Sequence, residues 1–92
     1  MDEGALVYER AASVLWRRTL DRVVARHVSS SDTVTMAGTG AIVWDALAEP
    51  MSLDSLAQLM GERFDSHAEA IRSELAPFLD DLVERGVVAL HR

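Results

Sequence analysis

The sequence predicts an α+β fold of the winged helix-turn-helix type, in which a three-stranded antiparallel sheet is followed by three helices. Short runs rich in β-branched residues occupy residues 14–36, and turn-forming residues separate them. From residue 41 to residue 85 apolar side chains recur at helical spacing, with interruptions at Pro50 and near Ser66. The 92 residues and the 49% hydrophobic content suffice for one small domain with a single core.

The predicted sheet begins with a hairpin. Residues 14–19 and 23–28 are rich in β-branched and aromatic side chains, and Leu20-Asp21-Arg22 between them favours a turn. A third short strand is predicted over residues 33–36, with its two larger apolar side chains on one face and its two threonines on the other. Residues 1–12 show no clear period, so we expect a loosely attached arm there.

The first two helices have recognisable ends. The first is predicted over residues 41–49, capped by Thr39 or Gly40, because Pro50 discourages its continuation. Ser52 fits the N-cap of the second helix. The apolar stripe of that second helix consists of Leu53, Leu56, Ala57, Met60 and Phe64.

The third helix is predicted over residues 66–85. Ser66-His67-Ala68-Glu69 has the form of a capping box, and Gly86 lies where a glycine commonly ends a helix. Residues 87–90 then return as a short extended segment. Pro77 inside this helix removes one backbone hydrogen bond and should bend the helix, either at a tolerated solvent-facing turn or so as to shape a groove.

The remaining composition limits location and partners. The domain is expected to span residues 13–92, and it has no cysteine for a disulfide or a thiolate metal site. No run approaches the roughly 18 apolar residues that cross a bilayer. The opening Met1-Asp2-Glu3 lacks the basic and apolar regions of a secretory signal. We therefore expect a cytoplasmic protein without a membrane partner.

Charge argues against nucleic acid as a partner. The net charge is −6, and residues 37–92 contain ten acidic residues and four arginines, whereas residues 1–36 contain five of each. Proteins that bind nucleic acid gain most of their affinity by neutralising phosphates with a basic surface. An acidic C-terminal half does not provide that surface.

No stretch predicts catalysis. Gly38-Thr39-Gly40 resembles a phosphate-binding loop, but a Walker loop needs a lysine, which the chain lacks, and a dinucleotide fingerprint needs a third glycine where Val43 stands. This glycine pair therefore predicts a turn and a helix start. The three histidines, His27, His67 and His91, lack the spacing of a helical metal site. We predict that the protein is not an enzyme and uses no metal or cofactor.

Three stretches of the chain carry a family resemblance: "VLWRRTLDRVVARHV", "GTGAIVWDALAEPMSLDSLAQLMGERFD" and "LAPFLDDLVERGVV". Together they resemble the PqqD-like proteins, small peptide chaperones whose fold is also called the RiPP recognition element. The similarity covers roughly residues 13–90. Its most specific parts are the Gly-Thr-Gly-Ala helix start with the following Val-Trp, the Leu-x-x-Leu stripe of the second helix, and the ending Phe-Leu…Leu…Arg-Gly-Val-Val that begins at Phe78.

The resemblance implies a domain that binds the leader segment of a ribosomally made precursor peptide and presents it to a modifying enzyme or a leader peptidase. The leader is added as an extra β-strand beside the third strand, in a groove that the third helix completes. By this resemblance the backbone edge consists of Thr33, Val34, Thr35 and Met36. The helical wall is drawn from Arg72, Leu75, Ala76, Leu79 and Val83.

Elementary energetics agree with such a groove. An edge strand has unpaired N–H and C=O groups that a second extended chain can satisfy. Four or five hydrogen bonds at about 0.5–1.5 kcal/mol each barely offset the cost of association, so apolar side chains of the peptide must also enter pockets. Candidates for lining such pockets, for plain core packing, or for both are Val34, Met36, Leu75 and Leu79.

Two other functions stay open. The first is a winged-helix transcriptional regulator, although residues 66–85 contain only two arginines against five acidic residues. The second is a structural subunit that lends its strand edge to a partner enzyme or to its own copy. The protein itself is expected to be a monomer or a weak or domain-swapped dimer. The sequence also leaves open whether the precursor becomes a lasso peptide, a redox cofactor or another modified peptide.

Overall fold

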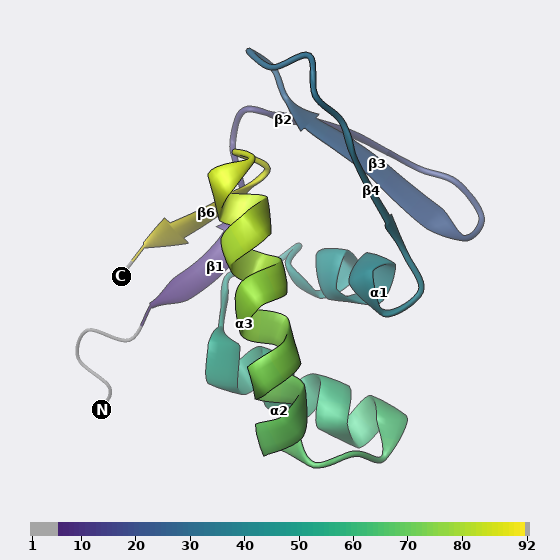
Figure 1. Cartoon of the computed structure of the whole chain (residues 1–92), viewed down its shortest axis with the longest axis vertical. Helices are drawn as coiled ribbons and strands as arrows, with labels where there is room; N and C mark the ends of the chain where they lie inside the picture. The colour runs from purple at the N-terminus through teal and green to yellow at the C-terminus, as the bar shows by residue number, and fades with distance from the viewer. Residues whose placement is uncertain (1–5, 92) are drawn as a thin grey trace.

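The computed structural model describes residues 6–91 of the chain. Its elements follow the order β1–β2–β3–β4–α1–β5–α2–α3–β6 (Figure 1). The strands are β1 Val7–Arg10, β2 Val14–Arg18, β3 Arg22–His27, β4 Val34–Ala37, β5 Met51–Ser52 and β6 Val88–His91. The helices are α1 Thr39–Ala46, α2 Leu53–Phe64 and α3 Ala68–Glu84.

The strands form two antiparallel sheets. The first has the order β2-β3-β4 and consists of the predicted hairpin and the predicted third strand. Its register pairs Val14 with His27 and Val23 with Met36, so β3 lies in the middle. This three-stranded sheet precedes the three helices, and the predicted α+β fold of winged helix-turn-helix type is confirmed.

The second sheet, with the order β5-β1-β6, was not predicted. Its central strand corrects the expectation of a loose arm over residues 1–12, because Val7 pairs with both Ser52 and His91. Only four residues of β1 are paired, too few for an alternation to be visible, and its partners lie far along the chain. Residues 7–10 therefore belong to the folded domain, which was expected to begin at residue 13, whereas residues 1–5 of the expected arm lie outside the described residues.

The helix starts test the predicted caps. Gly38 precedes α1 with a φ of 58°, a backbone conformation that favours glycine, and this glycine pair is a turn and a helix start as predicted. Thr39 and Gly40 therefore lie within α1 and do not cap it. Ser52 caps α2 as predicted, since its side chain accepts a hydrogen bond from the backbone N–H of Ser55 at 3.1 Å.

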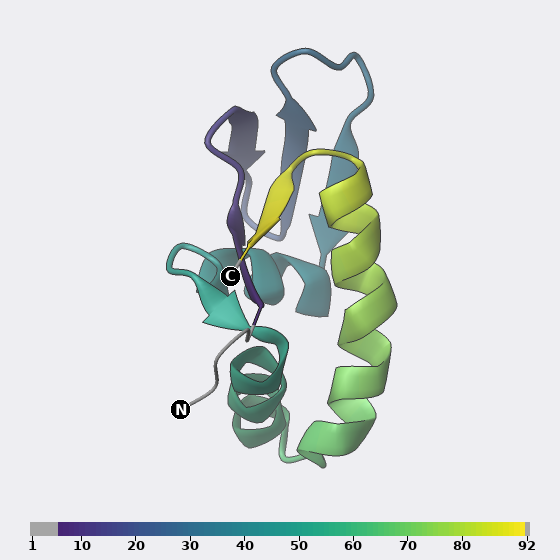
Figure 2. The same cartoon turned by 90° about the vertical axis from the view of Figure 1, so that its left-hand side faces the viewer.

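The capping box predicted for α3 is wrong. His67 stands at the N-cap without a side-chain hydrogen bond, and the hydroxyl of Ser66 instead donates to the carbonyl of Phe64 at 3.3 Å. The helix continues through the exposed Pro77 to Glu84 and runs along the length of the molecule (Figure 2). Gly86 follows its end with a φ of 80°, which confirms the predicted helix stop.

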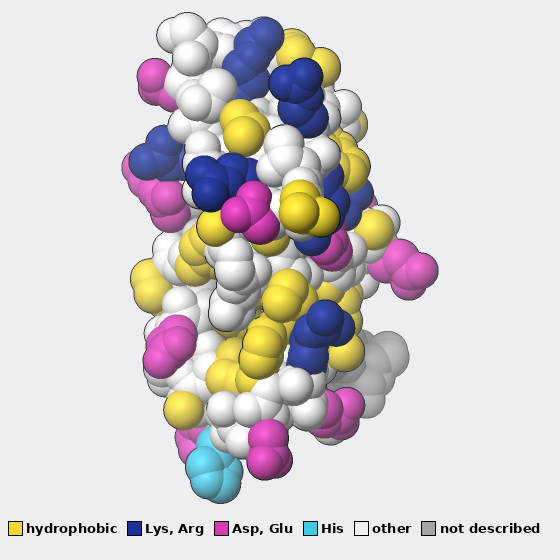
Figure 3. All heavy atoms as spheres, turned by 90° about the vertical axis from the view of Figure 1, so that its right-hand side faces the viewer, with side chains coloured by type: hydrophobic (Ala, Val, Ile, Leu, Met, Phe, Trp, Pro, Cys, Tyr) yellow, Lys and Arg dark blue, Asp and Glu magenta, His cyan; other side chains and the backbone are white. Residues whose placement is uncertain are grey.

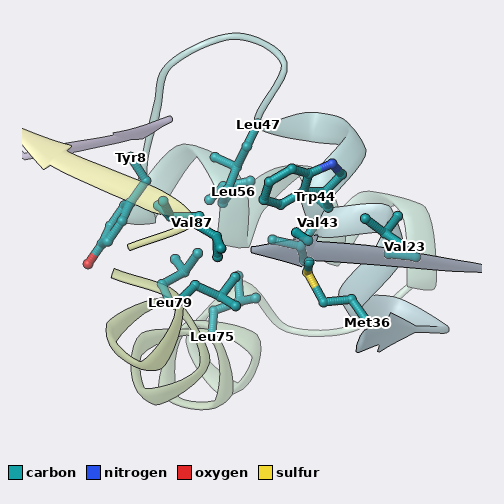
Figure 4. Close-up of a cluster of buried hydrophobic side chains, with 14 of the residues drawn as sticks. Tyr8, Val23, Met36, Val43, Trp44, Leu47, Leu56, Leu75, Leu79 and Val87 are labelled. Carbon is teal, nitrogen blue, oxygen red and sulfur yellow. The ribbon is translucent and has the colours of Figure 1, made fainter. Parts of the chain in front are cut away.

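Trp44 lies at the centre of the core with 0% of its surface exposed. In Figure 4, Leu75 and Leu79 project from α3 toward the cluster around Val43, and Met36 reaches the same cluster from β4. The core therefore joins α1, α3 and the β2-β3-β4 sheet. The prediction that Trp44 is a core residue is confirmed.

Arg10 links the two sheets through α1. Its Nε and Nη2 atoms donate to the carbonyl of Trp44 at 3.1 and 2.9 Å. The guanidinium also lies 4.6 Å from the ring centroid of Trp16 on β2 and 5.1 Å from that of Trp44. Burial lowers the pKa of Arg10, and the nearby Asp45 opposes that shift. The side chain thus satisfies a carbonyl near the C-terminus of α1 while it packs between two indoles.

Replacing Trp44 with alanine should lower the free energy of unfolding by about 3–5 kcal/mol, because the substitution leaves a large cavity in the core. The ring of Trp16 packs edge-on against that of Trp44, with 5.7 Å between the ring centroids, but Trp16 is 42% exposed. Trp16→Ala is therefore the matched control. We expect the control to cost about 1–2 kcal/mol. Urea denaturation measures both values, and equal losses would contradict the central position of Trp44.

Candidate functional site

The outer edge of β4 is open within the described residues. β4 is the last strand of the β2-β3-β4 sheet and pairs with β3 on one side only. In Figure 2 the C-terminal half of α3 lies beside β4, on the side away from β2. An open strand edge next to a helix is the arrangement in which a further strand can be added.

The register of the sheet determines which groups of β3 face β4. At one end of the β2-β3 hairpin the N–H of Thr19 donates to the carbonyl of Arg22 at 2.9 Å. At the other end the N–H of Val28 donates to the carbonyl of Ser13 at 2.9 Å. Hydrogen-bonded pairs alternate along an antiparallel ladder. The intervening residues Val23 and Ala25 therefore direct their backbone groups toward β4.

The same alternation continues into β4. Val23 is paired with Met36 and Ala25 with Val34, so the N–H and C=O groups of Met36 and Val34 face β3. The backbone groups of Thr35 and Ala37 consequently face the open edge. Thr35 thus presents one donor and one acceptor at the middle of the site.

A cavity of about 460 Å³ opens beside this edge, between β4, α1, α2 and α3. Its apolar wall includes Met36, Val43, Met60, Phe64, Ile71, Leu75 and Phe78. The lining also has hydroxyl groups from Thr35, Thr39 and Ser66, and Glu74 is its one charged residue within the described part of the chain. Such a lining suits a large apolar side chain with a polar neighbour.

Gly40 allows α1 and α3 to approach each other at this cavity. A Cβ atom placed on Gly40 would lie 3.3 Å from Cζ of Phe78 and 3.6 Å from Cβ of Met36. The missing side chain lets the Phe78 ring lie against α1, where it forms part of the cavity wall. The second glycine of the pair therefore serves close packing.

The predicted site residues divide into two groups. Thr35, Met36 and Leu75 line the cavity. Thr33 is exposed just before β4, and Val34 is half-buried on it. The structure places the other predicted helical residues elsewhere: Ala76 and Val83 are half-buried outside the lining, Leu79 lies fully in the core and Arg72 pairs with Asp54 on α2 at 2.7 Å.

The cavity is also lined by α3 residues that the sequence analysis did not assign to the site. These are Ile71, Glu74 and Phe78. They lie about one residue, or about 100° of helix rotation, from the predicted wall. The available signal was Phe78 itself, an aromatic residue with the helical spacing to share a face with Ile71 and Leu75.

The two arginines near the acidic face of α3 have carboxylate partners. Arg72 pairs with Asp54, and Arg85 pairs with Asp81 at 3.0 Å. Phosphates of a duplex would have to compete with these carboxylates, so α3 is poorly suited to lie in a DNA groove. Most other arginines lie on strands β2 and β3 and not on α3. In Figure 3 arginine side chains gather over the end of the molecule that this sheet forms.

The described residues contain no group of three or more His, Cys, Asp or Glu side chains that could hold a metal ion. Burial, with a smaller contribution from Asp80, raises the pKa of Tyr8, and hydrogen bonding to Arg22 lowers the pKa of Asp21. Neither residue lines the cavity. Within residues 6–91 no helix is long and apolar enough to cross a membrane.

Hydrogen exchange should distinguish the two sets of β4 amides. The N–H groups of Val34 and Met36 face β3 and should exchange at least about 100-fold more slowly than those of Thr35 and Ala37, which face the open edge. Amide-resolved NMR in deuterated buffer measures all four rates. Equal protection of Thr35 and Met36 would show that the edge is covered or that the register differs.

Comparisons with known proteins agree with this architecture. A sequence profile of the family described as coenzyme PQQ synthesis protein D (PqqD) matches residues 22–88. The solved structure "TbiB1 in Complex with the TbiA(beta) Leader Peptide" is similar with a TM-score of 0.79 and 16% identity, over 88% of this chain and 94% of that one. Comparison with curated sequences finds no match. Since the profile covers more than half of the chain, the protein belongs to the PqqD family.

Proposed function

We propose that this protein is a leader-peptide-binding chaperone of a natural-product pathway. It captures the leader of a ribosomally made precursor peptide as a strand added to β4 and presents the precursor to a modifying enzyme or a leader peptidase. The observation that carries the proposal is the open β4 edge beside an apolar cavity. Membership of the PqqD family and the fold shared with TbiB1, whose structure holds a leader peptide, support it.

The energetics require both parts of the site. Thr35 and Ala37 direct four backbone groups outward, which at about 0.5–1.5 kcal/mol net per hydrogen bond contribute about 2–6 kcal/mol. Association costs roughly 4–15 kcal/mol, so hydrogen bonds alone give no stable complex. Each large apolar side chain buried in the cavity adds about 1.5–3 kcal/mol. The strand edge thus fixes the path of the peptide, and apolar side chains in the cavity add the free energy that the hydrogen bonds lack.

In this proposal the chemistry belongs to the partner enzymes, and the protein itself binds without catalysing a reaction. Because the precursor is made by ribosomes, we place the function in the cytoplasm. The protein acts as a monomer or as a weak or domain-swapped dimer that leaves β4 free, since a second copy paired at β4 would occupy the peptide's edge.

Thr35→Pro should weaken leader binding at least about tenfold, because proline removes the outward N–H while leaving the β3 pairing in place. Thr35→Val keeps that N–H and is the matched control, with an affinity near that of the wild type. The probe is the N-terminal half of a small peptide encoded beside the gene, titrated into labelled protein and followed by NMR. Equal affinities of the two variants would argue against strand addition.

Phe78→Ala should weaken binding of the same peptide about 10- to 100-fold, because it removes one apolar wall of the cavity. Leu59→Ala is the control, since Leu59 is a 40% exposed apolar residue on α2 outside this cavity. Thermal unfolding establishes that both variants are folded. A Phe78→Ala variant that is folded and binds with wild-type affinity would place the peptide elsewhere.

The titration also tests the transcriptional regulator. Peptide binding should shift amides of β4 and of α3, whereas duplex DNA should leave them unchanged at physiological salt. A steep loss of DNA binding with rising salt, accompanied by shifts along α3, would support the regulator and contradict the chaperone.

A further inference from the structure

Glu74 gives the apolar cavity an uncompensated negative charge. Among residues 6–91 it is the only charged residue that lines the cavity, and it is exposed. The nearest basic residue along α3 is Arg72, whose guanidinium lies 2.7 Å from Asp54. No ion pair of the described residues involves Glu74.

The charges along α3 itself are mostly negative, and Arg63, which is next to the lining residue Phe64 on α2, lies outside the lining. The other exposed acidic residues of α3 are Glu69, Asp80, Asp81 and Glu84. With a net charge of −6 for the whole chain, the potential near α3 disfavours an acidic ligand and favours a basic one.

The spacing of α3 matches that of an added strand. Glu74 and Phe78 are one helical turn apart, about 5–6 Å between neighbouring side chains on the same face. Alternate residues of a strand are about 6.6–6.8 Å apart on one face. A strand lying along β4 and α3 therefore brings one side chain to the apolar wall near Phe78 and another, two residues away, to Glu74.

We propose that the segment recognised by this groove contains a large apolar residue with a lysine or arginine two positions away, and that the cation pairs with Glu74. This inference rests on the proposed function and adds the chemical class of its ligand: a basic, apolar peptide strand. The apolar residue of the peptide enters the cavity, and the negative charge of Glu74 selects a lysine or arginine two positions away in the peptide.

The probe is a displayed library of random 12-residue peptides, selected against the purified full chain. Wild-type protein should enrich peptides with an apolar position and Lys or Arg two residues away. Glu74→Arg should exchange that preference for Asp or Glu. Glu69→Arg makes the same charge change on α3 outside the cavity and should keep the wild-type preference.

A selected basic peptide is then measured against each variant by fluorescence anisotropy. Glu74→Arg should weaken its binding about 3- to 10-fold, more at low salt than at high salt, while Glu69→Arg should change it less than twofold. Circular dichroism verifies that both variants are folded.

The outcomes separate this inference from the proposed function. If enriched peptides share the apolar position but no basic one, and Glu74→Arg selects the same peptides, the inference is overturned while strand addition stands. If the library yields no common pattern, or if Thr35→Pro binds the selected peptides as tightly as Thr35→Val does, the proposed function fails together with the inference.

Discussion

The packing of Trp44 is the constraint on which the rest of the molecule depends. The indole is fully buried between the sheets and the helices. The guanidinium of Arg10 on β1 donates hydrogen bonds to the backbone carbonyl of Trp44. Its ring nitrogen is the single buried side-chain polar atom without a hydrogen-bond partner among the described residues. The large apolar area that the ring buries outweighs the cost of that missing bond. Because α1 is fixed in this way, β4 directly before it is fixed as well.

The open edge and the cavity follow from how β4 and α3 meet the core. Met36 on one face of β4 is buried in the core, and Leu75 and Leu79 on one face of α3 are buried in the same core. Neither element can move closer without displacing these side chains, because protein interiors are close-packed. The space between them is therefore a property of the folded core rather than of a loose loop. A peptide would find its binding site already formed, which lowers the entropic cost of association.

Local sequence features predicted much of this fold, and the failures have a common physical origin. Ser52 and Gly86 were correctly assigned because caps and stops depend on a few neighbouring residues. β1 could not be found, because its stability comes from pairing with β5 and β6 far along the chain. The candidate site was similar: the edge at β4 was assigned from the family resemblance, whereas the wall formed by Glu74 and Phe78 depends on the rotation of α3. An amphipathic stripe leaves that rotation uncertain by about one residue.

The pairing of β1 with β6 also determines how the domain can be joined to other polypeptides. Val7 and His91 are paired in the sheet, so the first and last strands of the described chain have their outer ends side by side. In Figure 1 this place is on the opposite side of α3 from β4. A surface tether, a fluorescent protein or a second enzyme attached at either end would leave the strand edge accessible. Covalent joining at these ends could therefore raise the local concentration of a captured peptide at an attached enzyme without altering the groove.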